Sequence, residues 1–157
     1  MSTPTRIALI GCGAIGSAML ELLQADAALA IQAIVVPADA FAAAQATAER
    51  LAPGAQVVSC VPPEGIDLVV EAAGHAAIEA HVLPALRRGT PCVVASVGAL
   101  STPGLAEKLE AAALAGGTQV QLIAGAIGAI EALAAARVGG LDEVRYIGRK
   151  PHQAWKG

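Results

Sequence analysis

The chain has 157 residues, 55% of them hydrophobic, and a formal net charge of −3. Because no apolar run reaches about twenty residues and no basic cluster exceeds Arg87-Arg88, the sequence predicts neither a membrane-spanning helix nor binding to nucleic acid or anionic membranes. The three cysteines, Cys12, Cys60 and Cys92, lack the spacing of metal ligands and are predicted to be small buried residues of a cytoplasmic protein without a metal site.

The first predicted element is a strand, Ile7 to Ile10, which has no polar face and is typical of a strand buried on both sides in a parallel sheet. A glycine-rich segment follows it, and then a helical pattern begins. The apolar face of that predicted helix consists of Ile15, Met19, Leu22 and Leu23.

The segment between this strand and helix carries the pattern G-x-G-x-x-G. Gly11 permits a tight turn, Gly13 lets the backbone approach a pyrophosphate, and Gly16 allows the helix to pack closely on the sheet. The first helical turn adds free N–H groups and the positive end of the helix dipole. The strand–loop–helix context therefore predicts dinucleotide binding at Gly11, Gly13, Ala14, Ile15 and Gly16.

Strand and helix patterns continue to alternate along the chain. Further strands are predicted at Ile31–Val36, Gln56–Cys60, Asp67–Glu71, Pro91–Ala95 and Val120–Ala124. Six strands joined by helical crossovers indicate an α/β fold, a doubly wound parallel sheet of the Rossmann type with strand order 3-2-1-4-5-6. Its ligand crevice is then expected at the carboxyl ends of strands one and four.

Two of the crossover helices have clear end signals. One is predicted from His75 to Arg88, bent at Pro84 and ended by Gly89, with an apolar face made of Ile78, Val82, Ala85 and Leu86. The other is predicted to open with Thr102 as its N-cap, followed by Pro103, and to end at Gly116-Gly117.

Small residues follow strands four, five and six, where they can admit a flat nicotinamide-ribose close to the backbone. The predicted cofactor-facing residues there are Ala73, Gly74, His75, Ser96, Val97, Gly98 and Ala126, with Gly125 and Ile127 beside the last. Ordinary turn chemistry explains any single one of them equally well. For His75, capping of its helix or solvation is favoured over catalysis, and His81 and His152 are predicted to be solvated.

The cofactor is predicted to be NAD or NADP. An NAD-specific fold usually places an acidic residue at the end of strand two, to hold the ribose hydroxyls. Here that position reads "VVPADA", where Asp39 is the only nearby acid, after Pro37, and no arginine is present to bind a 2′-phosphate. A slight preference for NAD, with dual use, is expected.

Three segments resemble the L-aspartate dehydrogenases: "GCGAIGSAMLELL", "DLVVEAAGHAAIEAHVLPALRRGTPCVVASVGALS" and "QLIAGAIGAIEALAAARVGGLDEVRYIGRKPHQAW". The resemblance implies oxidation of L-aspartate to iminoaspartate or oxaloacetate with NAD(P), the reverse amination, a link to NAD biosynthesis, and a homo-oligomer. It also places Ala126 by the cofactor. Ala124 departs from the serine expected at that turn, and the family's catalytic histidine lies beyond residue 157, so no catalytic residue is assigned.

The resemblance further implies two domains, a dinucleotide-binding domain over residues 1–124 and the start of an α+β substrate domain over residues 125–157, which the chain contains only in part. A helix near Ile127–Arg137 and a strand near Glu143–Arg149 are predicted there. The alternatives are a non-catalytic dinucleotide-binding module, or a related enzyme such as a homoserine dehydrogenase or a dihydrodipicolinate-type reductase.

Overall fold

The computed structural model describes residues 3–124, 130–145 and 147–149. The chain divides into two compact units, Met1–Gly125 and Ala126–Gly157. Within the described residues, no helix combines the length and the apolar character needed to cross a membrane.

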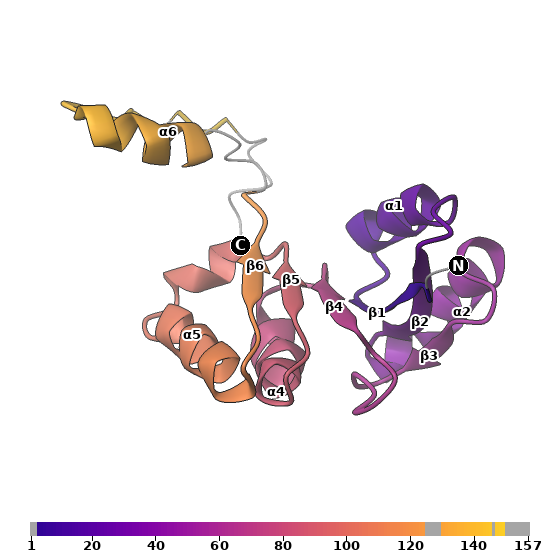
Figure 1. The fold of residues 1–157 in the computed structure, drawn as a ribbon. Helices are drawn as coiled ribbons and strands as arrows, with labels where there is room; N and C mark the ends of the chain where they lie inside the picture. Colours follow the sequence, from indigo (N-terminus) through magenta and orange to yellow (C-terminus); the bar gives the residue numbers. More distant parts are fainter. Residues whose placement is uncertain (1–2, 125–129, 146, 150–157) are drawn as a thin grey trace. The chain divides into compact units, whose positions relative to one another are not determined.

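The first unit is built on a six-stranded sheet in which every pair of neighbours is parallel and the order is β3-β2-β1-β4-β5-β6 (Figure 1). This is the predicted doubly wound order. The strands are β1 (Thr5–Ile10), β2 (Leu29–Val35), β3 (Gln56–Val58), β4 (Leu68–Glu71), β5 (Cys92–Val94) and β6 (Val120–Leu122).

The helices lie in the connections between the strands. In the first unit they are α1 (Ala14–Leu23), η1 (Ala38–Ala40), α2 (Phe41–Leu51), α3 (His75–Ala77), η2 (Ile78–Val82), α4 (Leu83–Arg87), η3 (Val97–Ser101) and α5 (Leu105–Gly116). The second unit contains α6 (Ile130–Ala136) and η4 (Arg137–Gly139).

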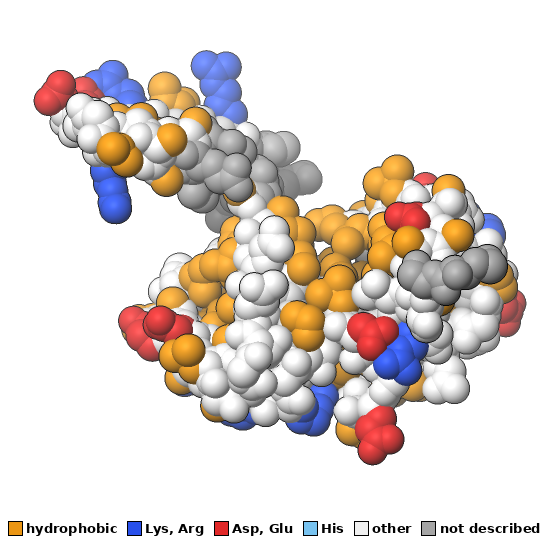
Figure 2. Space-filling view, in the orientation of Figure 1, with side chains coloured by type: hydrophobic (Ala, Val, Ile, Leu, Met, Phe, Trp, Pro, Cys, Tyr) orange, Lys and Arg blue, Asp and Glu red, His pale blue; other side chains and the backbone are white. Residues whose placement is uncertain are grey.

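Hydrophobic side chains gather at the carboxyl ends of the strands, between α1 and β6 (Figure 2). This is the edge at which the topology of a doubly wound sheet places its ligand crevice, because the crossovers on its two halves turn in opposite directions from β1 and β4.

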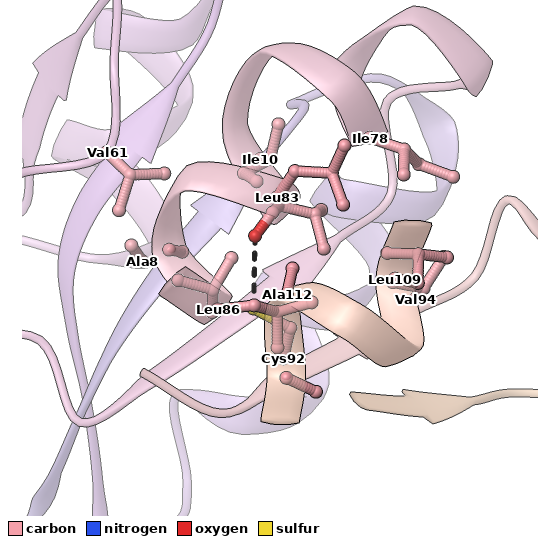
Figure 3. Packing of buried hydrophobic residues seen from close by; sticks show 14 of the residues in the cluster. Ala8, Ile10, Val61, Ile78, Leu83, Leu86, Cys92, Val94, Leu109 and Ala112 are labelled. Atoms are coloured by element: carbon pink, nitrogen blue, oxygen red, sulfur yellow. Dashed lines mark hydrogen bonds between the residues drawn. The ribbon is translucent and has the colours of Figure 1, made fainter. Parts of the chain in front are cut away.

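The sheet is buried on both faces, as the uninterrupted apolar run of β1 indicates. Ile7 and Leu9 pack with α1 and α2 in one cluster, whereas Ala8 and Ile10 belong to a second cluster with α4 and α5. Figure 3 shows the second cluster, where Leu86 approaches Ala112. Because successive side chains in a strand point to opposite faces, an all-apolar strand supplies both layers at once.

The predicted apolar face of α1 is wrong for Ile15 and Leu22, whereas Met19 packs against the core and Leu23 is half-buried. Gly16 and Leu20 are its buried residues, whereas Ile15 and Leu22 are 59% and 79% exposed. A Cβ at Gly16 would overlap the carbonyl oxygen of Gly11, so the helix approaches the loop backbone closely at Gly16, and this contact sets the rotation of the helix. Leu20, one turn later, then faces the sheet.

The second predicted helix, His75–Arg88, is divided into α3, a π-helical turn η2, and α4. Pro84 has no N–H to donate to the carbonyl of Ala80. The wide turn η2 contains Ala80 and ends at Val82, two residues before Pro84. The predicted apolar face is confirmed, because its four residues are fully buried, and Gly89 ends the helix with a φ of +87°.

The predicted start of α5 is wrong. Thr102 is not its N-cap: the N–H of Leu105 donates to the Thr102 carbonyl at 3.2 Å, and Gly104 between them has a φ of +80°. Proline followed by a left-handed glycine forms a type II turn, and the helix begins only after it, at Leu105. The predicted end at Gly116-Gly117 is confirmed.

The cysteines differ from one another in burial. Cys92 is buried, Cys12 is half-buried and Cys60 is exposed, so the prediction of three buried thiols is wrong for Cys60. The Cys92 thiol donates to the Val82 carbonyl at 3.9 Å, the dashed line in Figure 3. Burial raises the pKa of Cys92 to about 12, which keeps this thiol protonated and unreactive at neutral pH.

In the second unit, α6 lies within the predicted helix Ile127–Arg137, of which residues 127–129 are outside the described residues. The predicted strand Glu143–Arg149 is not formed by residues 143–145 or 147–149. A strand needs a hydrogen-bonded neighbour, and the alternation of side chains alone does not supply one.

Candidate functional site

The glycine-rich loop after β1 is held by two close backbone contacts. Gly11 has a φ of +94°, and a Cβ there would lie 2.8 Å from the carbonyl oxygen of Ala72, at the end of β4. Gly16 packs against the Gly11 carbonyl in the same way. Both positions therefore require glycine for packing, and together they bring the end of β1, the start of α1 and the end of β4 close to one another.

Gly13 is different, because a Cβ at this position would meet no atom within 4 Å. It is the exposed N-cap of α1, with extended backbone and no side-chain cap. The first N–H groups of a helix have no partner inside the helix, and the dipole makes this end positive. Open space beside uncapped N–H groups fits an approaching pyrophosphate.

A cleft of about 560 Å³ opens at the carboxyl ends of the strands, within the usual size of small-molecule sites. Its lining carries no acidic or basic side chain apart from two histidines. The lining residues are Ile10, Gly11, Val35, Val36, Pro37, Ser59, Ala73, Gly74, His75, Ala76, Ala77, Ala80 and His81.

A second cleft, of about 300 Å³, adjoins the first on the side of α1 and α2. Both clefts are lined by Gly11, Val36, Pro37 and Ala73, so they meet at the ends of β1, β2 and β4. The smaller cleft adds Gly13, together with small side chains of the glycine loop and α2. The two clefts together form a continuous site around the glycine loop.

The structure brings some of the predicted site residues together in these clefts and leaves others apart. Gly11, Gly13, Ala73, Gly74 and His75 line one or both of them. The cleft linings do not include Ala14, Ile15, Gly16, Ser96, Val97 or Gly98. Ala14 and Ile15 are exposed in the first turn of α1. Gly98 lies against His75, because a Cβ on it would be 3.1 Å from the His75 Nε2. Ala126, Gly125 and Ile127 lie outside the described residues.

Sequence reasoning missed Glu71, the last residue of β4, whose side chain is fully buried. Its Oε1 accepts hydrogen bonds from the N–H groups of Ala73 and Gly74, both at 2.8 Å, and from the Ser96 hydroxyl at 2.9 Å. Its Oε2 accepts the Ser96 N–H at 3.1 Å. The available signal was an acidic residue ending an apolar run, "LVVEAAG", where burial obliges the carboxylate to find donors.

His81 was predicted to be solvated, but it is half-buried in η2 and lines the larger cleft. Burial lowers the pKa of His81, which favours the neutral imidazole at pH 7. Within the described residues, neither His81 nor His75 forms a side-chain hydrogen bond to another side chain or to the backbone. An orienting partner of the kind that catalytic histidines have is therefore not found in this part of the chain.

The end of β2 contains little that discriminates between cofactors. Val36 and Pro37 line both clefts, whereas Asp39 lies exposed in η1 and lines neither. The described residues contain no group of three or more histidine, cysteine, aspartate or glutamate side chains that could hold a metal ion.

Curated relatives named L-aspartate dehydrogenase match the chain closely. Those of Cupriavidus necator and Pseudomonas aeruginosa are each 57% identical to it over 96% of its residues. This confirms the resemblance predicted from the sequence. In both cases the match covers 57% of the relative, so the chain spans little more than half the length of these proteins.

Solved structures share the fold. An aspartate dehydrogenase from Thermotoga maritima superposes with a TM-score of 0.61 and 21% identity, covering 85% of this chain and 51% of that one. A dehydrogenase from Chromobacterium violaceum reaches a TM-score of 0.68 at 19% identity, covering 90% of this chain and 42% of that one. Residues 11–122, most of the chain, match the family described as homoserine dehydrogenase, NAD binding domain, and the chain therefore belongs to this family of NAD-binding domains.

Proposed function

We propose that this chain is the cofactor-binding part of an L-aspartate dehydrogenase, which oxidises L-aspartate to iminoaspartate or oxaloacetate with NAD or NADP and also runs the reverse amination. The observation that carries the proposal is the 57% identity to L-aspartate dehydrogenases over 96% of the chain. Iminoaspartate made in this way would serve NAD biosynthesis. L-Aspartate is then the small-molecule partner.

The residues of the site have separate parts in this proposal. The N–H groups of Ala14, Ile15 and Gly16 bind the pyrophosphate, which enters the open space at Gly13. The loop after β4, which lines the larger cleft, and the loop after β5 support the nicotinamide-ribose, while the apolar ends of β1 and β2 receive the adenosine half. For Ala126, a position by the cofactor is what the resemblance to the L-aspartate dehydrogenases implies. The bound nicotinamide supplies the hydride-accepting chemistry, and the protein supplies position and electrostatics.

We further propose that the 157-residue chain binds the cofactor but oxidises L-aspartate slowly. A well-placed acid–base group is worth about 10²–10⁴ in rate. His75 and His81 are the titratable groups in the larger cleft, and neither has an orienting side-chain partner among the described residues. The substrate carboxylates would also need cationic or hydroxyl groups, and the cleft lining offers only Ser59.

The deciding experiment measures NADH formation from L-aspartate by this chain and by the same chain extended with the remaining segment of its relatives. L-Homoserine serves as the comparison substrate, since the family description names that enzyme. We expect the extended chain to turn over L-aspartate about 10²–10⁴ times faster than the 157-residue chain. Turnover of L-homoserine in place of L-aspartate would identify L-homoserine as the substrate. Cofactor binding without turnover by either chain would favour a non-catalytic dinucleotide-binding module.

Equal turnover of L-aspartate by both chains would contradict the claim of slow oxidation and would point to His75 as the catalyst. A His75→Ala variant of the shorter chain would then lose that activity.

A further inference from the structure

We propose that Glu71 is a positioning residue that holds the loop after β4 and the loop after β5 in the arrangement that receives the nicotinamide half of the cofactor. The inference rests on the proposed dinucleotide-binding function. It concerns a fully buried carboxylate at the carboxyl end of β4, between β1 and β5 in the sheet.

Four donors converge on this one carboxylate. The N–H groups of Ala73 and Gly74 come from the loop after β4, and the N–H and hydroxyl of Ser96 come from the loop after β5. A carboxylate without a proton is an acceptor only, so all four donors find an acceptor here, three of them at Oε1 and one at Oε2. In the described part of the chain no lysine, arginine or histidine forms an ion pair with Glu71.

The bonds to Glu71 determine where both loops lie. Ser96 directs both of its donors inward, to Glu71, so the chain that follows it starts from a defined point. A second contact joins the same two loops, since the His75 ring lies against Gly98. Ala73, Gly74 and His75 line the larger cleft, so any displacement of the Glu71 carboxylate moves the cleft wall.

A Glu71→Gln variant isolates the role of the carboxylate because it keeps the size and shape of the side chain. The amide nitrogen is a donor, so whichever way the amide turns, at least one of the three backbone N–H groups faces another donor. One of the loops must then move to find a partner elsewhere. Ser96→Ala is a milder second variant that removes only the hydroxyl bond.

The test compares the affinities of NADH and AMP for each variant, by NADH fluorescence and by displacement, at a temperature where circular dichroism shows the folded state. AMP occupies only the half of the crevice beside β1 and β2. The control is Glu49→Gln, the same substitution at an exposed position of α2, where Glu49 accepts a hydrogen bond from the Gln45 amide at 3.2 Å.

We expect Glu71→Gln to weaken NADH binding by about tenfold or more, the scale of one unpaired buried N–H, while AMP affinity stays within about twofold. Ser96→Ala should give a smaller loss confined to NADH, and adding it to Glu71→Gln should change little more. Glu49→Gln should match the wild type.

Unchanged NADH affinity in Glu71→Gln, or equal losses for NADH and AMP, would overturn the inference and leave Glu71 a purely structural residue. If Glu71→Gln does not fold, Ser96→Ala decides, and unchanged NADH affinity there would overturn it as well. Failure of the wild type to bind either NADH or NADPH is a separate result, which would refute the proposed function and this inference with it.

Discussion

At the scale of single residues, three glycines in one motif serve two different purposes. Gly11 and Gly16 are required by packing, because a Cβ on either would collide with backbone atoms. Gly13 faces open space, so the folded chain itself places no steric demand on it. We propose that a ligand approaching its backbone closely accounts for glycine at this position of the loop.

Replacing Gly13 by valine is expected to weaken NADH binding at least tenfold, about 1.4 kcal/mol, without unfolding the protein. The branched side chain would occupy the open space proposed for the pyrophosphate, while the backbone φ of −77° suits valine. NADH fluorescence titration and thermal unfolding of the wild type and the variant test both halves of the expectation.

Gly16→Ala is the contrasting variant, at a glycine of the same motif that packing requires. It should lower the free energy of unfolding by about 1–3 kcal/mol, because the methyl group has to displace the Gly11 carbonyl. If Gly13→Val bound NADH as tightly as the wild type, the phosphate site would have to lie elsewhere.

Cofactor preference is expected to be shallow, with NAD and NADP affinities within about a hundredfold, or about 2.7 kcal/mol. Val36 and Pro37 line the clefts and Asp39 does not, so neither a carboxylate nor a guanidinium acts directly on the 2′ position. Competition titrations with both cofactors measure the ratio. A ratio of several thousand would mean that a selecting residue lies outside these linings.

At the scale of elements, side-chain bonds reinforce the parallel sheet at its amino end. Arg6, in β1, donates from Nε and Nη2 to the two carboxylate oxygens of Asp67 at 2.9 and 2.8 Å, just before β4. Its backbone N–H also donates to Asp67 at 2.8 Å. Hydrogen bonds from Arg6 hold the pKa of Asp67 at about 2, below its usual 3.8. The pair adds a link between neighbouring central strands.

Asp67→Asn should lower the melting temperature at pH 7, and the difference from the wild type should shrink between about pH 4 and pH 2. A pKa that folding lowers contributes stability above the unfolded-state value, and this stability is lost as the pH falls through the folded-state value. Thermal unfolding of both proteins across this range provides the measurement. A difference that stayed constant down to pH 2 would show that charge is not its source.

The packing of α4 on the sheet is expected to depend strongly on Leu86. Its side chain is fully buried in the cluster of Figure 3, so Leu86→Ala leaves a cavity and should destabilise the protein by about 2–5 kcal/mol. Leu22→Ala, at a position 79% exposed on α1, should change stability by less than about 0.5 kcal/mol. Urea unfolding of both variants checks the contrast, and equal losses would refute this assignment of the core.

At the scale of the whole molecule, both units expose large apolar side chains. Leu114 on α5 is 75% exposed, and Val138 and Ile147 of the second unit are 91% and 72% exposed. The strand predicted near Glu143–Arg149 is not formed by the described residues of that segment, so the structural reason to expect association is these exposed side chains. Exposed apolar surface of this kind favours association, because a contact with another copy would remove it from water.

The chain is therefore expected to self-associate at micromolar concentration, as the resemblance to oligomeric dehydrogenases also implies. Light scattering should give a mass of at least twice 15.5 kDa. Val138→Glu should reduce the association, because a charge in the contact would have to be desolvated. A single monomeric species at these concentrations would contradict the expectation.

The sequence by itself determined the strand order and the glycine-loop geometry, because both depend on local signals. An apolar strand, a glycine turn and a helix lie next to one another in the chain, and right-handed crossovers leave few ways to arrange six of them. The sequence prediction failed at two contacts that are themselves local in the chain. The approach of Gly16 to Gly11 set the buried face of α1, and the T-P-G-L turn delayed the start of α5.

Only the tertiary structure decided how the ends of the strands combine into a site. Glu71 and Ser96 are 25 residues apart in the chain, and neither segment contains a sequence signal that identifies the other residue as its hydrogen-bond partner. His81 lines the cleft from the wide turn η2, where a single bent helix was predicted. The physical reason is that a buried polar group takes its donors from whatever the fold brings near it, and that proximity exists only after the sheet has assembled.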